Sequence, residues 1–361
     1  MTTSFKLRTR ALRRAIARAN LDALLVTQPP NWYYLTGFTG EAGLLLAGPK
    51  MRPVIVTDGR FMVQAREETA GVPVVQQVGG LLESAGKLLQ EQKVRTVGYD
   101  PEQVTVAQLR NLRKAAGGRV RWTPVSRMVE TLRMNKDASE LAHMRRAALL
   151  ASEVVAGVAK VLRPGLREFE VAAEIEYHMR KRGSSGPAFE TIVASGARTA
   201  LPHARPTARR LGKNELVVLD LGAILGHYCS DITRTFYLGR APARIRGWYQ
   251  AVQEAQAAAV AAVKVGARCG DVDGAARSVL AGHRLDRYFS HSTGHGLGLQ
   301  VHEDPRVAKG QTRTLELGNV VTIEPGVYVE GVGGIRIEDD VAVHADHTEI
   351  LTRFTRDLIE I

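Results

Sequence analysis

The segment spanning residues 219–236, LDLGAILGHYCSDITRTF, constrains the fold most, because it places two aspartates within sequence that is otherwise typical of paired strands. Apolar, β-branched and aromatic residues dominate on both sides of its centre, as expected for a sheet. A two-residue turn at Leu225 and Gly226 predicts a hairpin in which Asp220 lies directly opposite Asp231. Their Cβ atoms would then be roughly 5 Å apart on one face.

Two carboxylates at that separation cannot both remain charged without compensation. They repel each other by about 3 kcal/mol at an effective dielectric constant of about 20. Either one carboxyl group is protonated, or a cation lies between the two. Proton sharing predicts an isolated acid pair, whereas a cation predicts further ligands elsewhere in the chain.

Two later segments supply such ligands. In TIEPGVYVEGVGGIRIEDD, residues 322–340, pairing about Gly331 places Glu324 opposite Glu338, although a bulge in the glycine-rich loop would shift this register. The segment HSTGHGLGLQVHEDP, residues 291–305, contains three histidines. The sequence therefore predicts two hairpins that each carry a carboxylate pair, and a separate loop that supplies at least one imidazole.

Four carboxylates and an imidazole in one pocket require cations, because buried negative charges would otherwise repel one another strongly. Two divalent ions would neutralise four carboxylates. Oxygen-rich ligation with one imidazole suits Mn²⁺ and permits Co²⁺, Fe²⁺ or Zn²⁺. Paired metals can polarise a carbonyl and activate water, so we expect hydrolysis of an amide-like or ester-like bond.

Composition excludes several other classes of protein. The 361 residues are enough for two domains, and no apolar run is long enough for a membrane span. The first residues do not resemble a secretory signal, and there are only two cysteines, so we expect a cytoplasmic location without disulfides. The net charge of +12 is dispersed and mostly due to arginine, without a nucleic-acid-binding motif, so we expect no nucleic-acid partner.

The pattern of elements predicts two domains. Residues 1–125 alternate strand-like and helix-like segments, which indicates an α/β domain. Residues 126–137 are expected to form a linker. Residues 138–361 begin with two long helical segments, separated by Arg163, Pro164 and Gly165, and continue with a mixture of strands and helices that indicates an α+β domain.

These motifs resemble those of the pita-bread dinuclear metallopeptidases, and most closely the Xaa-Pro peptidases: aminopeptidase P and Xaa-Pro dipeptidase, or prolidase. The resemblance covers most of the chain and is most specific in residues 200–340. It implies an α/β N-terminal creatinase/prolidase-like domain, a C-terminal pita-bread catalytic domain and a homodimer. It also implies a set of five metal ligands, which are Asp220, Asp231, His295, Glu324 and Glu338.

The resemblance also implies roles for individual residues. Glu324 would accept a proton during catalysis, and His302 in LQVHEDP would contact the scissile carbonyl. His203 in LPHARPT would help to orient substrate. His291 and Arg336 would line the pocket for the proline side of the substrate, although Arg336 is also suited to supporting the metal ligands.

Several functions are compatible with this ligand set. The segments TGFTGEAG and DGRF favour aminopeptidase P, which would release the first residue of a longer Xaa-Pro peptide. Prolidase, the alternative, would accept only the dipeptide and must neutralise its carboxylate. A methionine aminopeptidase is disfavoured by the additional N-terminal domain and by Arg336. A non-enzymatic binding module is disfavoured because all five ligand positions are retained.

Overall fold

The structure, a computed structural model, describes residues 3–69 and 71–361, so three residues of the expected N-terminal domain lie outside it. The chain divides into two compact units, Met1–Arg133 and Met134–Ile361. The division falls inside the segment 126–137 that was expected to be a linker. Part of that segment is helical, because α6 covers Met128–Arg133.

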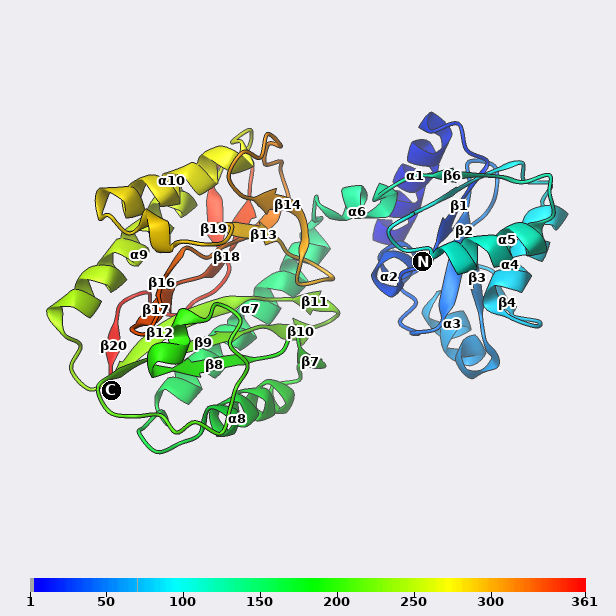
Figure 1. Cartoon of the computed structure of the whole chain (residues 1–361). Helices are drawn as coiled ribbons and strands as arrows, with labels where there is room; N and C mark the ends of the chain where they lie inside the picture. Colours follow the sequence, from blue (N-terminus) through cyan, green and yellow to red (C-terminus); the bar gives the residue numbers. More distant parts are fainter. Residues whose placement is uncertain (1–2, 70) are drawn as a thin grey trace. The chain divides into compact units, whose positions relative to one another are not determined.

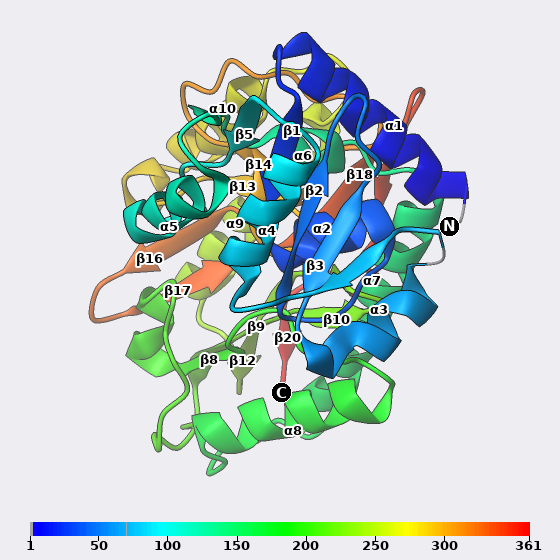
Figure 2. The same cartoon turned by 90° about the vertical axis from the view of Figure 1, so that its right-hand side faces the viewer.

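The N-terminal unit contains a six-stranded mixed sheet in the order β4-β3-β2-β1-β5-β6 (Figure 2). Strands β3 and β4 are parallel, as are β1, β5 and β6, whereas β2 is antiparallel to both of its neighbours. The strands are β1 (Ala23–Val26), β2 (Gly43–Ala47), β3 (Val54–Thr57), β4 (Val74–Gln76), β5 (Thr96–Tyr99) and β6 (Arg121–Pro124). The helices are α1 (Thr3–Arg18), α2 (Pro29–Thr36), α3 (Met62–Glu68), α4 (Leu81–Glu91), α5 (Val106–Ala116) and α6.

The expected α/β character of this unit is confirmed, but the sequence did not reveal two of its elements. Strand β2 is built on three consecutive leucines, which favour helix as readily as strand and give no alternation. Helix α2 begins with two prolines, which fit its first turn, where backbone N–H groups have no intrahelical partner. Neither element carries a periodic pattern long enough to be recognised from sequence.

The C-terminal unit surrounds its strands with two pairs of helices (Figure 1). One pair is α7 (Ala138–Ala159) and α8 (Glu168–Lys181), and the other is α9 (Ala243–Ala262) and α10 (Cys269–Gly282). One hydrophobic core lies between α7, α8 and the strands β8, β9 and β12. A second core lies between α9, α10 and the later strands. This arrangement confirms the expected α+β domain of the pita-bread type.

The strands of this unit form several small sheets. Sheet order is β20-β12-β9-β8 in one and β14-β13-β15-β18-β19 in another, and β16 pairs with β17. The early strands are β7 (Gly186–Pro187), β8 (Ile192–Ser195), β9 (Glu215–Leu221), β10 (Ala223–Leu225), β11 (Tyr228–Cys229) and β12 (Ile232–Leu238). The later strands are β13 (Gly294–Gly296), β14 (Glu303–Val307), β15 (Val320–Ile323), β16 (Gly326–Val329), β17 (Gly333–Arg336), β18 (Asp339–Val343), β19 (Thr348–Ile350) and β20 (Ile359–Glu360).

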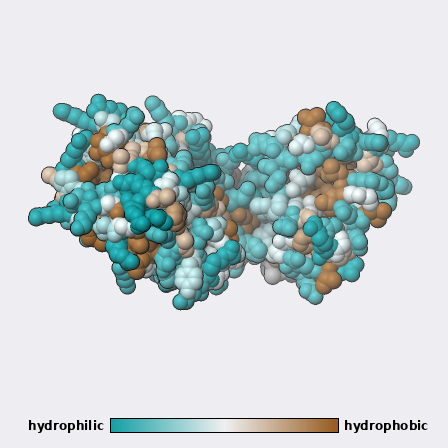
Figure 3. Space-filling view, turned by 60° about the horizontal axis from the view of Figure 1, so that its bottom comes forward, coloured by the Kyte–Doolittle hydropathy of each residue, from teal (hydrophilic) through white to brown (hydrophobic). Residues whose placement is uncertain are grey.

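Figure 3 shows a face on which hydrophobic residues are scattered in small groups among hydrophilic ones. Among the described residues, no helix combines the length and the apolar character needed to cross a membrane.

Candidate metal centre

The hairpin that carries Asp220 and Asp231 differs in register from the sequence prediction. Its turn lies at Gly226 and His227, because Leu225 pairs with Tyr228. Asp220 therefore lies opposite Thr233, and the prediction that it faces Asp231 directly is wrong. The reason is backbone conformation: both turn residues have positive φ, 58° and 71°, which a leucine at the first turn position would tolerate poorly. Both aspartates nevertheless line one cavity.

The second carboxylate hairpin has the predicted register. Ile323 pairs with Asp339 on one side of the glutamates, and Gly326 pairs with Arg336 on the other. Both pairings are symmetric about Gly331, so Glu324 and Glu338 occupy opposing positions. Both carboxylates line the same cavity as the two aspartates. Two hairpins that are distant in the sequence thus contribute a carboxylate pair each to one site.

His295 enters the site from β13, between two glycines that allow unusually close backbone contacts. A Cβ atom at Gly294 would lie 1.8 Å from the carbonyl oxygen of Thr322, so only glycine fits there. His295 Nδ1 donates to the carbonyl of Gly296 at 3.0 Å, which leaves Nε2 as the unprotonated nitrogen of the neutral ring. Nε2 lies 3.8 Å from Asp231 Oδ2 and 3.7 Å from Glu324 Oε1.

The chemistry of this cluster fits divalent cations. Ligand atoms of Asp231, His295 and Glu338 all lie within 4.8 Å of one another. Among the described residues, Asp220 Oδ1 and Asp231 Oδ1 are buried and have no hydrogen-bond partner, as expected for oxygens that bind an ion. The donor set, four carboxylates and one imidazole, suits hard or borderline divalent metals.

Without cations, the buried carboxylates of this cluster repel one another. This repulsion also indicates that the cluster binds divalent ions. Burial, together with repulsion between the carboxylates, raises the pKa of Asp231 and of Glu324 well above their ordinary values. The same causes raise the pKa of Glu338 to about 8. Burial, followed by the neighbouring His302, lowers the pKa of His295 to about 4, which keeps its imidazole neutral and able to bind a metal.

Arg336 contacts the candidate ligands from the side that faces away from the cavity. Its Nη2 donates to Asp220 Oδ2 at 2.6 Å, and its Nε donates to the hydroxyl of Thr233 at 3.0 Å. That hydroxyl in turn donates to Glu338 Oε2 at 2.6 Å. Arg336 is 3 % exposed and is not part of the cavity lining. Its contacts match the supporting role considered for it in the sequence.

His291 is likewise held away from the cavity. Its Nδ1 donates to the carbonyl of Ser292 at 2.8 Å, so its Nε2 must accept from the hydroxyl of Tyr328, also at 2.8 Å. Tyr328 accepts from Arg336 Nη1 at 2.8 Å. Burial, followed by the charge of Arg336, lowers the pKa of His291 to about 4. A continuous chain of hydrogen bonds therefore links His291 to Asp220.

The cavity itself has a volume of about 270 Å³. His203 and His302 line it, and the ring of His302 lies 4.4 Å from that of His295, centroid to centroid. Apolar side chains and one ion pair complete the lining. These residues are Phe189, Ile192 and Val301, with Glu190 and Arg205 paired at 3.0 Å.

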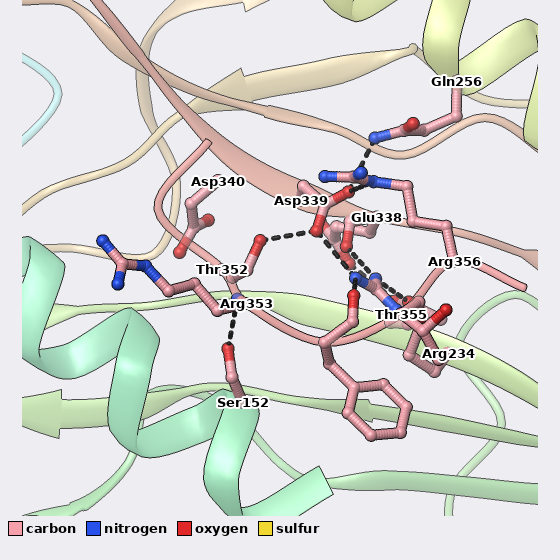
Figure 4. A network of polar contacts seen from close by, with 12 residues as sticks. Ser152, Arg234, Gln256, Glu338, Asp339, Asp340, Thr352, Arg353, Thr355 and Arg356 are labelled. Carbon is pink, nitrogen blue, oxygen red and sulfur yellow. Dashed lines mark hydrogen bonds and ion pairs between the residues drawn. The ribbon is translucent and has the colours of Figure 1, made fainter. Parts of the chain in front are cut away.

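Asp339 and Asp340, which follow the candidate ligand Glu338 in the sequence, are both buried. Asp339 binds Arg234, Gln256, Thr352 and Arg356 in the network shown in Figure 4. Asp340 Oδ2 accepts from the backbone N–H of Asp231 at 3.0 Å. Asp340 thus fixes the backbone of one candidate ligand, which places it in the supporting layer of the site.

Sequence reasoning missed the supporting residues Thr233 and Tyr328, and for Asp340 it left a surface position and a supporting position open. For Thr233 a signal existed, because it follows Asp231 by two positions and therefore shares its face of the strand. Nothing in the sequence marks Tyr328, since an aromatic residue is ordinary in a strand. For Asp340 the alternation after Glu338 was a usable signal, but a solvent-facing aspartate would give the same pattern.

Comparison with known proteins identifies the family. Residues 142–345 match the family described as metallopeptidase family M24, and residues 8–135 match the creatinase/prolidase N-terminal domain. The chain belongs to metallopeptidase family M24. Membership implies a peptidase that uses divalent metal ions, and it agrees with the pita-bread fold and with the cluster of candidate ligands.

Relatives of this M24 peptidase carry more specific descriptions. An Xaa-Pro dipeptidase from Pyrococcus horikoshii is 34% identical over 342 residues, which is 94% of this chain and 95% of the relative. The structure of an Xaa-Pro dipeptidase from Bacillus anthracis is 35% identical, with a TM-score of 0.96 over 99% of this chain and all of the other. An X-Pro aminopeptidase from Thermotoga maritima is 33% identical, with a TM-score of 0.89 over 96% of this chain and all of the other.

Proposed function

We propose that this M24 peptidase is an Xaa-Pro dipeptidase that hydrolyses the bond between a first residue and a following proline. The observation that carries the proposal is the cluster of four carboxylates and His295 beside a cavity with apolar walls, in a chain whose relatives include Xaa-Pro dipeptidases. These relatives favour the dipeptidase alternative over the aminopeptidase P interpretation to which the sequence motifs pointed.

We further propose that five residues hold two divalent ions, with Mn²⁺ the best match to the donor set. The residues that would hold the ions are Asp220, Asp231, His295, Glu324 and Glu338. Such ions supply Lewis-acid polarisation of a carbonyl and lower the pKa of water. Two ions are supported by charge balance, since four buried carboxylates call for four positive charges.

The remaining residues would bind and orient the substrate. Proline has no amide hydrogen and a fixed φ, so its recognition must come from shape and apolar contact. Phe189, Ile192 and Val301 provide apolar walls. His203 and His302 would orient the scissile carbonyl, and Glu324 would accept a proton. Arg336 and His291 would contribute by keeping Asp220 and Tyr328 in place, as their hydrogen bonds support.

A dipeptide also presents a free carboxylate close to the scissile bond. Arg205 supports the dipeptide proposal because it places a guanidinium in the cavity lining. Its side chain is 81% exposed, and its present partner Glu190 is 60% exposed, so the pair is open to exchange with a ligand. A substrate carboxylate could replace that of Glu190 at the same guanidinium.

Aminopeptidase P activity is the second candidate, and the similarity to the Thermotoga maritima X-Pro aminopeptidase favours it. The test compares Ala-Pro, Ala-Pro-Ala and Ala-Ala as substrates, with Mn²⁺ and with a chelator. We expect rapid cleavage of Ala-Pro, slow cleavage of Ala-Pro-Ala, none of Ala-Ala, and loss of activity on chelation. The Glu324→Ala variant, purified identically, should be inactive and controls for contaminating peptidases.

Each other outcome identifies a different function. Faster cleavage of Ala-Pro-Ala than of Ala-Pro would overturn the dipeptidase proposal in favour of aminopeptidase P. Cleavage of neither, with two metal ions bound, would direct attention to a methionine aminopeptidase or to a binding module. Full activity in Glu324→Ala would show that the site is wrongly placed.

A further inference from the structure

A fully buried glutamate outside the candidate metal centre has an unusual number of hydrogen-bond donors around it. Glu168, the first residue of α8, is 0% exposed. Its Oε1 accepts from Ser195 N at 2.9 Å and from Ser195 Oγ at 2.8 Å. Its Oε2 accepts from Thr207 N at 3.0 Å and from Thr207 Oγ1 at 2.6 Å. Together these donors hold the carboxyl group of Glu168 in one orientation.

These contacts join the two ends of a single loop. Ser195 is the last residue of β8, and Thr207 follows the loop formed by residues 196–206. One carboxylate therefore binds both ends, each with one oxygen. The backbone of α8 adds to the closure, because the N–H of Phe169 donates to the carbonyl of Thr207 at 3.2 Å.

The same carboxylate also reaches the middle of the loop. Arg198 Nε lies 3.2 Å from both oxygens of Glu168. Arg198 Nη2 then donates to the carbonyl of Arg205 at 2.7 Å. On the other side of His203, the carbonyl of Pro202 accepts from Arg336 Nη1 at 3.2 Å.

His203 is thus flanked on both sides by backbone carbonyls that arginines hold. Arg198 is bound to Glu168, and Arg336 is bound to Asp220 of the metal centre. The loop that brings His203 and Arg205 to the cavity is fixed between a structural carboxylate and a candidate metal ligand. A loop backbone held in this way loses little freedom on binding a substrate.

We propose that Glu168 is a positioning residue for His203: it sets the place of this histidine in the cavity by closing and bracing loop 196–206. The inference rests on the proposed function for the part His203 plays in turnover. It adds Glu168 to the residues needed for turnover, although Glu168 would contact neither the substrate nor a metal ion.

The informative substitution is Glu168→Gln, because it keeps size and shape. The backbone N–H groups of Ser195 and Thr207 and the Nε of Arg198 can only donate. A glutamine presents one oxygen and one NH₂ group, so one end of the loop would meet a donor instead of an acceptor. Glu170→Gln is the matched control on the same helix, since Glu170 is exposed and its carboxylate contacts the N–H of Arg167 instead of the loop.

The experiment is a double-mutant cycle with Glu168→Gln and His203→Ala, using Ala-Pro hydrolysis with Mn²⁺. We expect Glu168→Gln to lower kcat about tenfold, since small misplacements of catalytic groups are costly, with less than a twofold change in KM. In the His203→Ala background the same substitution should change kcat less than twofold, because the group through which it acts is absent. Glu170→Gln should leave kcat unchanged.

An equal loss of kcat from Glu168→Gln in both backgrounds would overturn the inference, because the glutamate would then act independently of His203. If wild type cleaves only Ala-Pro-Ala, the cycle is run on that peptide; the proposed function has then failed, and the inference is judged separately. If Glu168→Gln is insoluble, Thr207→Val, which removes one donor to Oε2, replaces it in the cycle.

A second measurement requires no turnover. The ring signals of His203, assigned by their loss in His203→Ala, are followed by NMR in the Zn²⁺-loaded protein. Glu168→Gln should shift or broaden them, whereas Glu170→Gln should not. Unchanged His203 signals in Glu168→Gln would contradict the proposal whatever the activity of the protein.

Discussion

At the scale of single residues, Thr233 connects the two hairpins that carry the carboxylates. Its hydroxyl donates to Glu338 Oε2 and accepts from Arg336 Nε, while Arg336 holds Asp220. Partners that orient metal ligands commonly affect metal affinity by about 10-fold to 100-fold. Removing the hydroxyl of Thr233 is therefore expected to lower the affinity for the metal ions.

Thr233→Val should weaken Mn²⁺ binding about tenfold, because it keeps the shape of the side chain but removes the hydrogen bonds to Glu338 and Arg336. Calorimetric titration of the metal-free protein with Mn²⁺ measures this. Thr235→Val is the matched control: the Thr235 hydroxyl bonds the backbone N–H and carbonyl of Arg336, so metal affinity should change less than about twofold. Equal weakening in both variants would contradict the role given to Thr233.

The candidate ligands were predictable from sequence because acidic residues in apolar strands are costly without a purpose. Asp220, Asp231, Glu324 and Glu338 all reach the cavity, as expected. His291 was expected at the substrate, and Arg336 either there or in support of the metal ligands; neither belongs to the cavity lining. Sequence cannot distinguish these positions, because the difference is the direction of a side chain in a folded sheet. The role of Glu168 could not be predicted from sequence either, because a glutamate at the start of an amphipathic helix is ordinary.

At the scale of elements, the turn between β10 and β11 sets the register that brings Asp220 beside Thr233. Gly226 and His227 both have positive φ, as in the two-residue turns that fit the twist of a hairpin. Glycine adopts this conformation without cost, and histidine is among the residues that tolerate it. A β-branched residue at position 227 would be strained.

His227→Val should lower the free energy of unfolding by about 1–2 kcal/mol more than His227→Asn does, because valine is strained at positive φ and asparagine is not. Both variants remove the imidazole, so their difference isolates the backbone. Urea unfolding followed by circular dichroism provides the two values. Equal free energies of unfolding in the two variants would mean that the turn can adopt another conformation. Positive φ at position 227 would then not explain the register of the hairpin.

The hairpin registers show why one prediction succeeded and the other failed. Symmetry about Gly331 was sufficient for Glu324 and Glu338, because the flanking strands are regular on both sides. In the first hairpin two adjacent turns with different registers were possible, and the criterion that separates them is which residues can take positive φ. The dipeptide Gly-His was the better candidate on that criterion.

At the scale of the whole molecule, the metal centre makes the stability of the protein depend on pH. In the metal-free chain the pKa of Glu338 is about 8, raised by burial and by neighbouring carboxylates. Its ordinary value in an unfolded chain is about 4.3. Between these values the folded state holds a proton that the unfolded state releases, so rising pH favours unfolding.

The metal-free protein should therefore lose about 1 kcal/mol of unfolding free energy between pH 7 and pH 8.5. His291, His295 and His302, whose pKa values burial lowers, oppose this trend where the unfolded chain still has protonated histidines, so the window begins above the ordinary histidine pKa. Urea denaturation at the two pH values tests the sign. Glu338→Gln should flatten the slope, and stability that increases with pH in the metal-free wild type would refute the assignment.

The network around Asp339 has a consequence for how the protein is made. Arg234, three residues after Asp231, donates to the carbonyls of Thr355 (Figure 4) and Phe354, and β12 pairs with β20. The strand that directly follows Asp231 is thus completed by residues more than a hundred positions further along the chain. A ribosome must therefore synthesise the chain past Glu360 before this strand gains its parallel neighbour, so the surroundings of the metal centre are completed late in synthesis.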